Sequence, residues 1–447
     1  MTHETTAPPG AYPGPASTGL LTDQYELTML AAALRDGTAH RPCVFEVFAR
    51  RLPDGRRYGV VAGTGRVLEA LQRFRFGEAE LDIARTFLDA ETVDWLADYR
   101  FSGDIDGYPE GEIYFPGSPI LTVRSSFAEA VLLETLVLSI LNHDSAIAAA
   151  AARMVSAAAG RPLIEMGTRR THEIAAVAAA RAAYLAGFTS TSNVEAARTF
   201  GVPSGGTAAH AFTLLHTGPD GADEEAAFAA QVAAQGAATT LLVDTYDITE
   251  GVNRAVRAAG PGLGGVRIDS GDLGIITRQV RAQLDSLGAT GTKIVVSGDL
   301  DEYAIGALRA EPIDVYGVGT SLVTGSGAPT AGMVYKLVEV DGVPVAKRSS
   351  HKETHGGEKR AVRLAKSTGT IVEEVLSPRD VEPRVPARLT ATPLQIPLVR
   401  GGDTALSLPT LEDARERLRA ALVSLPWEGL GLSHGEPAIP TRFEARS

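Results

Sequence analysis

The chain has 447 residues, of which 44% are hydrophobic and 21% charged, values typical of a globular protein with enough material for more than one domain. Its 42 Lys and Arg residues against 54 Asp and Glu residues give a net charge of −12, which argues against non-specific binding to nucleic acid or to an anionic membrane surface. Cys43 is the sole cysteine, which excludes an intrachain disulfide and a cysteine-based zinc site.

The N-terminal residues 1–18 are rich in Thr, Pro, Gly, Ala and Ser, and we expect them to form a disordered tail. They lack the basic and apolar regions of a signal peptide. No run of about 18 consecutive apolar residues follows, so we expect no membrane span. A cytoplasmic location fits the single cysteine.

Residues 19–124 mix helical and strand patterns and are expected to form an α+β domain. Thr22 or Asp23 can cap a helix that continues to Leu34. Residues 43–48 alternate in part between apolar and polar side chains, as a strand does.

Residues 125–332 show a different pattern. A long helical stretch, Ser126–Ala159, comes first, and short apolar strands then alternate with helices. The expected strands cover 162–166, 238–244, 265–269, 293–297 and 313–317, and the expected helices 172–186, 248–259, 273–287 and 301–310. This alternation predicts parallel strands, either as a barrel or as an open doubly wound sheet.

Residues 333–447 form a third segment. Strands over 333–340 and 343–348 are joined by Asp341-Gly342, a hairpin signal. Pro-rich loops, a helix over 411–422 and a loose end follow. We expect this segment to pack back on the N-terminal domain.

Each of the last four expected strands ends in a polar or glycine-bearing turn: Asp244–Asp247, Asp269–Asp272, Ser297–Asp299 and Gly317–Thr320. The C-terminal ends of parallel strands share one edge in a barrel and flank one crevice in an open sheet. The four turns are therefore expected to meet at one site under either architecture.

Glycines in two of these turns favour an anion. Gly298 and Gly319 let backbone amides approach a phosphate closely, which makes Ser297-Gly298-Asp299 and Gly317-Val318-Gly319-Thr320 candidate phosphate-binding turns. The alternative is that they are ordinary strand-to-helix turns.

Three aspartates, Asp244, Asp269 and Asp299, follow strands on the same expected edge. Carboxylates there can bind ribose hydroxyls, hold Mg²⁺ through water or stabilise a positive transition state. The alternative for each is an N-cap of the following helix.

Two groups of basic residues can also meet anions. Arg169 and Arg170 lie at the start of a helix, where a cation is unfavourable unless it faces an anion. The basic stretch Lys347–Arg360 can steer a polyphosphate. A pair of surface arginines and a solvated hairpin flank are the respective alternatives.

One histidine stands among small residues in Gly205–Phe212. The glycines and alanines around His210 leave room for a phosphate. The alternative is a histidine satisfied inside the core.

Seven ordered motifs together resemble nicotinate phosphoribosyltransferase, a type II phosphoribosyltransferase, over about Leu20 to Arg360. The motifs are Leu21–Glu26, Glu165–Arg170, Gly187–Asn193, Gly206–His210, Arg267–Asp272, Ser297–Asp299 and Tyr316–Thr320.

The resemblance implies an irregular TIM-like α/β barrel and an α+β domain built from both N- and C-terminal segments. It implies that nicotinate is joined to phosphoribosyl diphosphate, giving nicotinate mononucleotide and diphosphate in NAD biosynthesis. ATP would be the co-substrate of a ligase-class enzyme, hydrolysed through a phosphohistidine at His210, with Mg²⁺ as cofactor. Family members are usually homodimers in which an Asp-x-Tyr motif, here Asp23 and Tyr25, completes the partner's site.

The resemblance also assigns roles to single residues. The catalytic candidates are His210, Asp244 and Asp269, and the substrate-binding candidates are Asp23, Tyr25, Arg169, Ser192, Thr207 and Arg267. Ser192 matches the position of an aspartate in nicotinamide phosphoribosyltransferase, and a neutral hydroxyl there favours nicotinate. Met166 departs from the phenylalanine common in the family, which affects the stacking of the pyridine ring.

Three other functions stay open. They are a nicotinamide phosphoribosyltransferase, a quinolinate phosphoribosyltransferase, and a non-catalytic barrel that binds phosphorylated metabolites. A quinolinate enzyme needs extra basic residues for a second carboxylate and does not need His210 for ATP, so the chain length and the Gly206–His210 motif argue against it.

Overall fold

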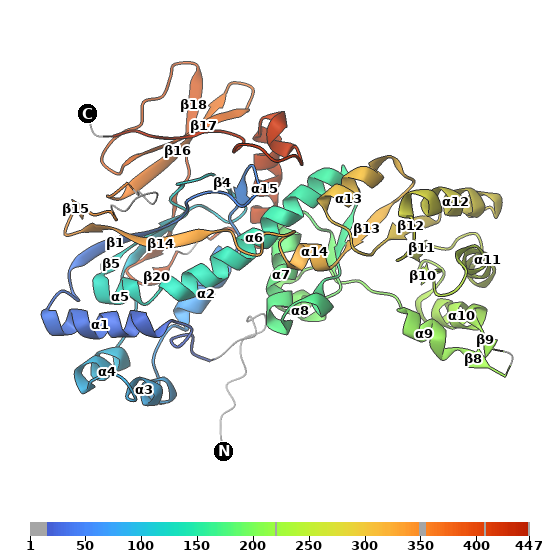
Figure 1. Cartoon of the computed structure of the whole chain (residues 1–447), viewed down its shortest axis with the longest axis horizontal. Coiled ribbons are helices and arrows are strands. Elements are labelled where there is room, and N and C mark those ends of the chain that lie inside the picture. Colours follow the sequence, from blue (N-terminus) through green and yellow to red (C-terminus); the bar gives the residue numbers. More distant parts are fainter. Residues whose placement is uncertain (1–15, 220, 348–354, 406–407, 446–447) are drawn as a thin grey trace. The chain divides into compact units, whose positions relative to one another are not determined.

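The computed structural model describes residues 16–219, 221–347, 355–405 and 408–445. The chain folds as two compact units (Figure 1). Unit 1 contains Ala150–Gly327, and unit 2 joins residues up to Ala149 with those from Ala328 onward. The boundary therefore lies inside helix α6 (Glu134–Ala158), whereas the sequence pattern placed it at residue 125. No glycine or proline interrupts α6, so one continuous helix runs from unit 2 into unit 1.

The tail expected over 1–18 can be compared with the structure only at its last three residues. Residues 1–15 lie outside the described residues. Thr18 is buried, and its hydroxyl donates a hydrogen bond of 2.7 Å to the carbonyl of Ala70. A buried and hydrogen-bonded Thr18 belongs to the folded part of unit 2.

Unit 1 is built on a sheet of six parallel strands. Their order is β10 (Thr240–Leu242), β11 (Gly265–Ile268), β12 (Lys293–Val296), β13 (Val315–Val318), β6 (Leu163–Glu165) and β7 (Ser190–Thr191). This confirms the α/β class. In the described chain the end strands β10 and β7 do not pair with each other, so the sheet is a curled half barrel rather than a closed ring.

Four helices of unit 1 follow strands as the sequence predicted: α7 (Glu173–Ala186), α11 (Ile248–Ala259), α12 (Leu273–Ser286) and α13 (Glu302–Ala307). Four further helices were not predicted: α8 (Val194–Phe200), α9 (His210–Leu215), α10 (Glu224–Gln235) and α14 (Thr320–Val323). Figure 1 shows α10, α11 and α12 side by side near β10 and β11. The hairpin β8 (Thr217–Gly218) and β9 (Gly221–Ala222) lies between α9 and α10 in the chain. Between consecutive strands of the sheet the chain returns through α11, α12 or α13, which keeps these strands parallel.

Unit 2 is built on a seven-stranded sheet that combines segments from both ends of the chain. Its order is β15 (Val343–Pro344), β14 (Met333–Val340), β1 (Pro42–Ala49), β5 (Leu121–Ser126), β3 (Asp104–Gly107), β19 (Ile396–Arg400) and β20 (Asp403–Thr404). A two-stranded sheet pairs β2 (Gly59–Val60) with β4 (Ile113–Tyr114). The helices of this unit are α1 (Gln24–Asp36), α2 (Thr64–Gln72), α3 (Glu78–Ala84), α4 (Ala90–Ala97), α5 (Phe127–Val131) and α15 (Leu411–Ser424).

A second sheet of unit 2 lies where we expected loops and a loose end. It contains β18 (Leu389–Pro393), β16 (Lys359–Lys366), β17 (Ile371–Pro378) and β21 (Thr441–Phe443). The expectation was wrong because charged residues interrupt the apolar pattern of these strands. Arg363 of β16 is buried and forms an ion pair of 2.6 Å with the buried Glu374 of β17. Such paired charges can occupy core positions that hydrophobic periodicity does not reveal.

The hairpin predicted at Asp341-Gly342 is present. Both residues have positive φ, 50° and 76°, as the tight turn requires. Its second strand ends at Pro344 rather than at residue 348. The expected basic stretch Lys347–Arg360 lies in part, over 348–354, outside the described residues.

Among the described residues, one helical stretch is long and apolar enough to cross a membrane. It covers Phe127–Ala158, has a mean hydropathy of 1.3, and has 67% of its most apolar window buried inside the protein. A buried core helix meets the same criteria of length and composition.

Helix α11 packs closely against the end of β10 at Gly251. A Cβ atom added at Gly251 would lie 2.3 Å from the carbonyl oxygen of Val243. Although alanine favours helices over glycine, we expect Gly251→Ala to destabilise the chain by about 1–3 kcal/mol because the backbone must move. The measurement is the urea midpoint followed by circular dichroism.

Gly262→Ala is the matched control, because an added Cβ there meets no atom within 4 Å. Equal urea midpoints for the two variants would contradict the close packing at Gly251.

Candidate functional site

Three strand-end turns of unit 1 are joined by hydrogen bonds. The backbone N–H of Asp269, after β11, donates to Oδ2 of Asp244, after β10, at 2.8 Å. The hydroxyl of Ser297, after β12, donates to Oδ1 of Asp269 at 2.9 Å. The predicted meeting of these turns at one edge of the sheet is thus observed for Asp244, Asp269 and Ser297.

The three aspartates are not the caps of the helices that follow. In each turn a later aspartate accepts the capping N–H of the helix. The caps are Asp247 for α11, Asp272 for α12 and Asp301 for α13, and the earlier aspartates are Asp244, Asp269 and Asp299. This division leaves the earlier carboxylates available to a ligand.

His210 lies beside these aspartates. It is the first residue of α9, and its Nδ1 is 3.0 Å from the hydroxyl of Thr245. Its Nε2 is 3.9 Å from Oδ1 of Asp244 and 4.0 Å from Oδ2 of Asp269. The side chain is 40% exposed. His210 is therefore not a histidine enclosed in the core, and a substrate can reach its ring.

Two buried polar atoms at the site have no hydrogen-bond partner in the described structure. They are Oδ1 of Asp244, whose side chain is 1% exposed, and Nε of Arg267. Arg267 also places Nη2 at 3.7 Å from Oδ2 of Asp269. An unpaired buried polar atom costs free energy that a bound ligand or ion can recover. Asp244 thus offers a free carboxylate oxygen, and Arg267 a free donor.

A small pocket of about 100 Å³ lies at this edge of the sheet. Its lining comprises Met166, Arg169, Arg170, Arg267, Asp269, Ser297, Gly298, Asp299, Gly317, Gly319 and Thr320. Pockets that enclose a whole ligand are usually about 300–1,000 Å³. The pocket therefore fits one phosphate-sized group, and the rest of a larger substrate must lie across the open edge.

The cations of the pocket come mainly from one turn. Arg169 and Arg170 lie on the short helix η1 (Thr168–Arg170) that follows β6, and both are exposed. No described acidic residue forms an ion pair with either guanidinium. Free guanidiniums beside glycine-bearing turns favour an anionic ligand.

Two positions in the pocket require glycine, one for its backbone dihedral angle and one for a close contact. Gly298 has φ of +129°, which disfavours other residues. A Cβ atom at Gly317 would lie 2.7 Å from Sδ of Met166 and 3.1 Å from Cβ of Ser297. Gly317 thus accommodates the Met166 side chain, a role that the sequence did not reveal.

Two predicted substrate-binding residues of unit 1 lie outside the pocket lining. The backbone N–H of Ser192, after β7, donates to the carbonyl of Glu165 at 2.8 Å, so Ser192 follows the strand next to β6 on the same edge. Thr207 is exposed in the loop before α9. Both stay candidates for parts of the substrate beyond the phosphate.

Asp23 and Tyr25 belong to unit 2. Asp23 is in the N-cap position of α1, although its side chain makes no capping bond, and Tyr25 is 45% exposed. Partial burial and then the charge of Glu134 raise the pKa of Tyr25 to about 12. Its phenol is therefore neutral at physiological pH, and its aromatic ring can stack on another ring.

Three residues that hold the site together were not predicted from the sequence. Thr245 contacts His210, and the hydroxyl of Ser270 donates to Asp244 Oδ2 at 2.8 Å. Glu165 is fully buried and accepts hydrogen bonds from the N–H of Gly167 and the hydroxyl of Thr191. The presence of two aspartates in one turn was a signal that one caps the helix and the other is available to a ligand. No sequence pattern indicated the role of Glu165.

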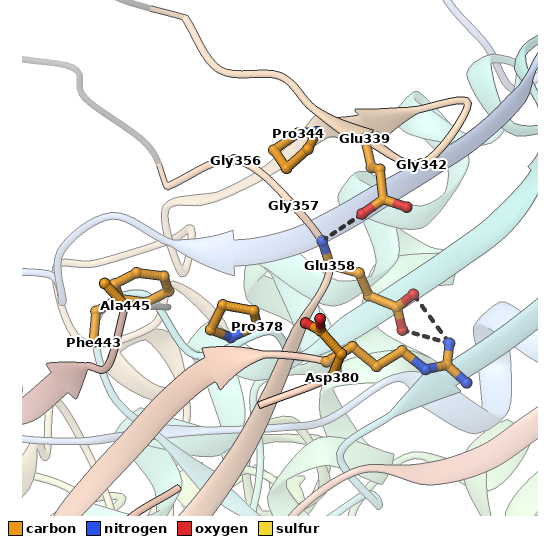
Figure 2. Close-up of a pocket in the computed structure, with 11 residues that line it drawn as sticks. Glu339, Gly342, Pro344, Gly356, Gly357, Glu358, Pro378, Asp380, Phe443 and Ala445 are labelled. Carbon is orange, nitrogen blue, oxygen red and sulfur yellow. Dashed lines mark hydrogen bonds and ion pairs between the residues drawn. The ribbon is translucent and has the colours of Figure 1, made fainter. Parts of the chain in front are cut away.

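A larger cavity, of about 580 Å³, lies in unit 2 (Figure 2). Figure 2 shows Glu339 accepting a hydrogen bond from the backbone N–H of Glu358. The carboxylate of Glu358 also pairs with Arg379, at 2.7 Å and 3.0 Å. With Asp380, three carboxylates face this cavity against one guanidinium. The smaller pocket of unit 1 has three arginines against two aspartates in its lining, so it is the better candidate for a phosphate-bearing anion.

The fold and the geometry of this edge are those of α/β proteins that bind phosphorylated small molecules where parallel strands end. The family model for the nicotinate phosphoribosyltransferase (NAPRTase) N-terminal domain matches residues 20–142, and that for the NAPRTase family matches residues 162–368. The chain therefore belongs to the nicotinate phosphoribosyltransferase family.

Relatives agree with this assignment. The chain is 66% identical over 429 residues to nicotinate phosphoribosyltransferase pncB1 of Mycobacterium tuberculosis, covering 95% of each chain. It is 39% identical over 365 residues to nicotinate phosphoribosyltransferase of Bacillus subtilis, covering 78% of this chain and 73% of that one. The crystal structure of human nicotinic acid phosphoribosyltransferase matches with a TM-score of 0.80 at 28% identity, over 95% of this chain and 98% of that one.

Glu165 gives the site a pH-dependent stability. Burial raises the pKa of Glu165 above its usual 4.5. The folded chain therefore keeps a proton that the unfolded chain releases, so the free energy of unfolding falls as pH rises from 4.5 through the folded-state pKa. Glu165→Gln stays neutral and should lose less stability than the unmodified chain between about pH 5 and about pH 8.

Urea midpoints at the two pH values measure this difference. The exposed Glu250→Gln on α11 is the control and should follow the unmodified chain at both. A stability difference between Glu165→Gln and the unmodified chain that is constant with pH would show that Glu165 is ionised in the folded state.

Proposed function

We propose that this chain catalyses the joining of nicotinate to 5-phosphoribosyl 1-diphosphate in NAD biosynthesis. The pyridine nitrogen forms the bond to the ribose C1 while the bond from C1 to the diphosphate oxygen breaks. The electron pair of that bond leaves with the diphosphate. The observation that carries the proposal is the linked edge of Asp244, Asp269 and Ser297 next to an arginine-bearing pocket.

The charges of this edge suit such a reaction. Breaking the bond at C1 builds positive charge on the ribose ring, and Asp244 and Asp269 supply carboxylates that stabilise it or hold the ribose hydroxyls. Arg169, Arg170 and Arg267 supply cations for phosphate or carboxylate groups of the substrates.

The donor set also fits Mg²⁺. The unpaired Oδ1 of Asp244 and the exposed side of Asp269 are carboxylate oxygens, the ligands this ion prefers. When bound, Mg²⁺ neutralises negative charge on the diphosphate. Asp244 and Asp269 are the residues that would hold it, directly or through water.

The proposal includes a coupling to ATP, which would place the enzyme in the ligase class. A ring nitrogen of His210 attacks the γ-phosphorus of ATP, ADP leaves with the electron pair of the broken bond, and water later releases phosphate from the phosphohistidine. The aspartates at 3.9 Å and 4.0 Å stabilise the positive imidazole formed in the attack. Phosphorylation adds about two negative charges beside these carboxylates, which favours rearrangement of the turns.

We further propose a cytoplasmic homodimer in which Asp23 and Tyr25 of one chain complete the site of the other. A neutral Tyr25 phenol can stack on the pyridine ring, and a reducing compartment suits the free, buried Cys43.

One assay tests the proposed reaction. Phosphoribosyl diphosphate is offered with nicotinate, nicotinamide or quinolinate in turn, with and without ATP, and the mononucleotide is measured. Formation of the mononucleotide from nicotinate, and not from the other two substrates, supports the proposal. A preference for nicotinamide or quinolinate favours a nicotinamide or a quinolinate phosphoribosyltransferase. Absence of turnover with all three favours a non-catalytic binding protein.

His210→Ala tests the coupling to ATP. It should abolish transfer of label from γ-labelled ATP to the protein and the stimulation by ATP, because no other described residue offers an imidazole next to Asp244 and Asp269. The label should be acid-labile and alkali-stable.

His216→Ala, at the other end of α9, is the matched control because His216 contacts the carbonyl of Phe212 instead. Retained labelling in His210→Ala would show that another residue is phosphorylated.

Ser192→Asp tests the choice of pyridine substrate. A carboxylate there repels nicotinate and accepts from the amide of nicotinamide, so the ratio of kcat/KM for nicotinate over nicotinamide should fall by about tenfold to a hundredfold. The neutral Ser192→Asn serves as a size control and should change the ratio less. An unchanged ratio in Ser192→Asp would place Ser192 away from the substituent of the ring.

A further inference from the structure

A buried carboxylate lies at the end of β6, behind the phosphate pocket. Glu165 is 0% exposed. Its two oxygens accept separate hydrogen bonds, one from the backbone N–H of Gly167 and one from the hydroxyl of Thr191. No ion pair joins it to a basic residue of the described chain. A buried carboxylate without a cation is costly, which points to a function for these two bonds.

The hydrogen bonds continue from Glu165 in a closed circuit. The Thr191 hydroxyl accepts from the N–H of Asn193 at 2.9 Å. The Asn193 amide then donates to the hydroxyl of Thr168 at 3.2 Å. Thr168 begins η1, the same short helix that Glu165 holds through Gly167. The circuit therefore ties the turn after β7 to the turn after β6.

Both turns carry candidate substrate contacts. Arg169 and Arg170 follow Thr168 directly and line the phosphate pocket. Ser192 lies between Thr191 and Asn193, and its backbone N–H donates to the carbonyl of Glu165 at 2.8 Å. A shift of this circuit would move the arginines and Ser192 together.

Glycine at position 167 makes the first link possible. A Cβ atom there would lie 2.2 Å from Cγ1 of Val323 and 3.0 Å from Oε1 of Glu165. The backbone N–H of Gly167 can therefore approach the carboxylate only without a side chain. The carboxyl group of Glu165, ionised or protonated on one oxygen, can accept hydrogen bonds from both Gly167 and Thr191. An apolar side chain at this position could accept neither.

We infer that Glu165 and Thr191 are positioning residues that set the relative placement of the phosphate-binding arginines and of Ser192. They act through the backbone and through Asn193, without touching a substrate. Their loss would weaken binding of both phosphoribosyl diphosphate and nicotinate. This inference rests on the proposed function.

Thr191→Val tests the inference, because it conserves shape and removes only the hydroxyl. We expect KM for both substrates to rise by about fivefold to tenfold, with a smaller change in kcat. Thr191→Ser restores the hydroxyl and should restore KM.

Thr189→Val is the matched control. Thr189 lies two residues earlier, and its hydroxyl donates to the carbonyl of Leu163 at 3.0 Å rather than to Glu165. It should leave both KM values unchanged.

A second variant keeps the inference testable if Thr191→Val does not fold. Asn193→Ser retains an N-cap for α8, since serine caps helices as well as asparagine, and loses the bond to Thr168. It should raise KM for phosphoribosyl diphosphate in the same direction.

The outcomes separate two failures. Unchanged KM values in Thr191→Val and Asn193→Ser, or a fall in kcat alone from a smaller folded fraction, would overturn the positioning role. Absence of nicotinate turnover by the unmodified chain would instead overturn the proposed function.

Discussion

The site depends on one interaction, the acceptance of the Asp269 backbone N–H by the Asp244 carboxylate across neighbouring parallel strands. This bond, with the Ser270 hydroxyl, compensates one oxygen of a carboxylate that is almost fully buried. The other oxygen stays unpaired and faces the His210 ring. Because the bond uses backbone of the next turn, it holds Asp269 in place as well, and Ser297 extends the link to a third turn.

Such an arrangement is preorganised. The carboxylates are held by groups that do not need to move when a substrate binds, which is how fixed dipoles stabilise developing charge at low cost. Other aspartates, Asp247 and Asp272, cap the helices that follow. Asp244 and Asp269 are therefore not needed for helix capping and stay available to a ligand. On the far side of the pocket, the Glu165 circuit gives the arginine-bearing turn similar support.

Much of unit 1 was predictable from local signals. The strands and helices between 238 and 318 follow the sequence closely, because each strand is a short apolar run and each helix begins at an aspartate cap. The second sheet of unit 2 was not predictable in this way. Its core holds Arg363 and Glu374, and a buried ion pair looks like two surface charges until the partners are brought together.

The sequence by itself determined the α/β class, the family and the set of strand-end turns, since these depend on local periodicity and on motifs that persist along the chain. Only the tertiary structure decided which aspartate caps a helix, that the parallel sheet is a half barrel, and that Thr245, Ser270 and Glu165 support the site. For the three supporting residues the reason is physical: Ser270 and Glu165 bond to turns 26 residues away in the chain and Thr245 contacts a residue 35 away, and parallel packing creates that proximity.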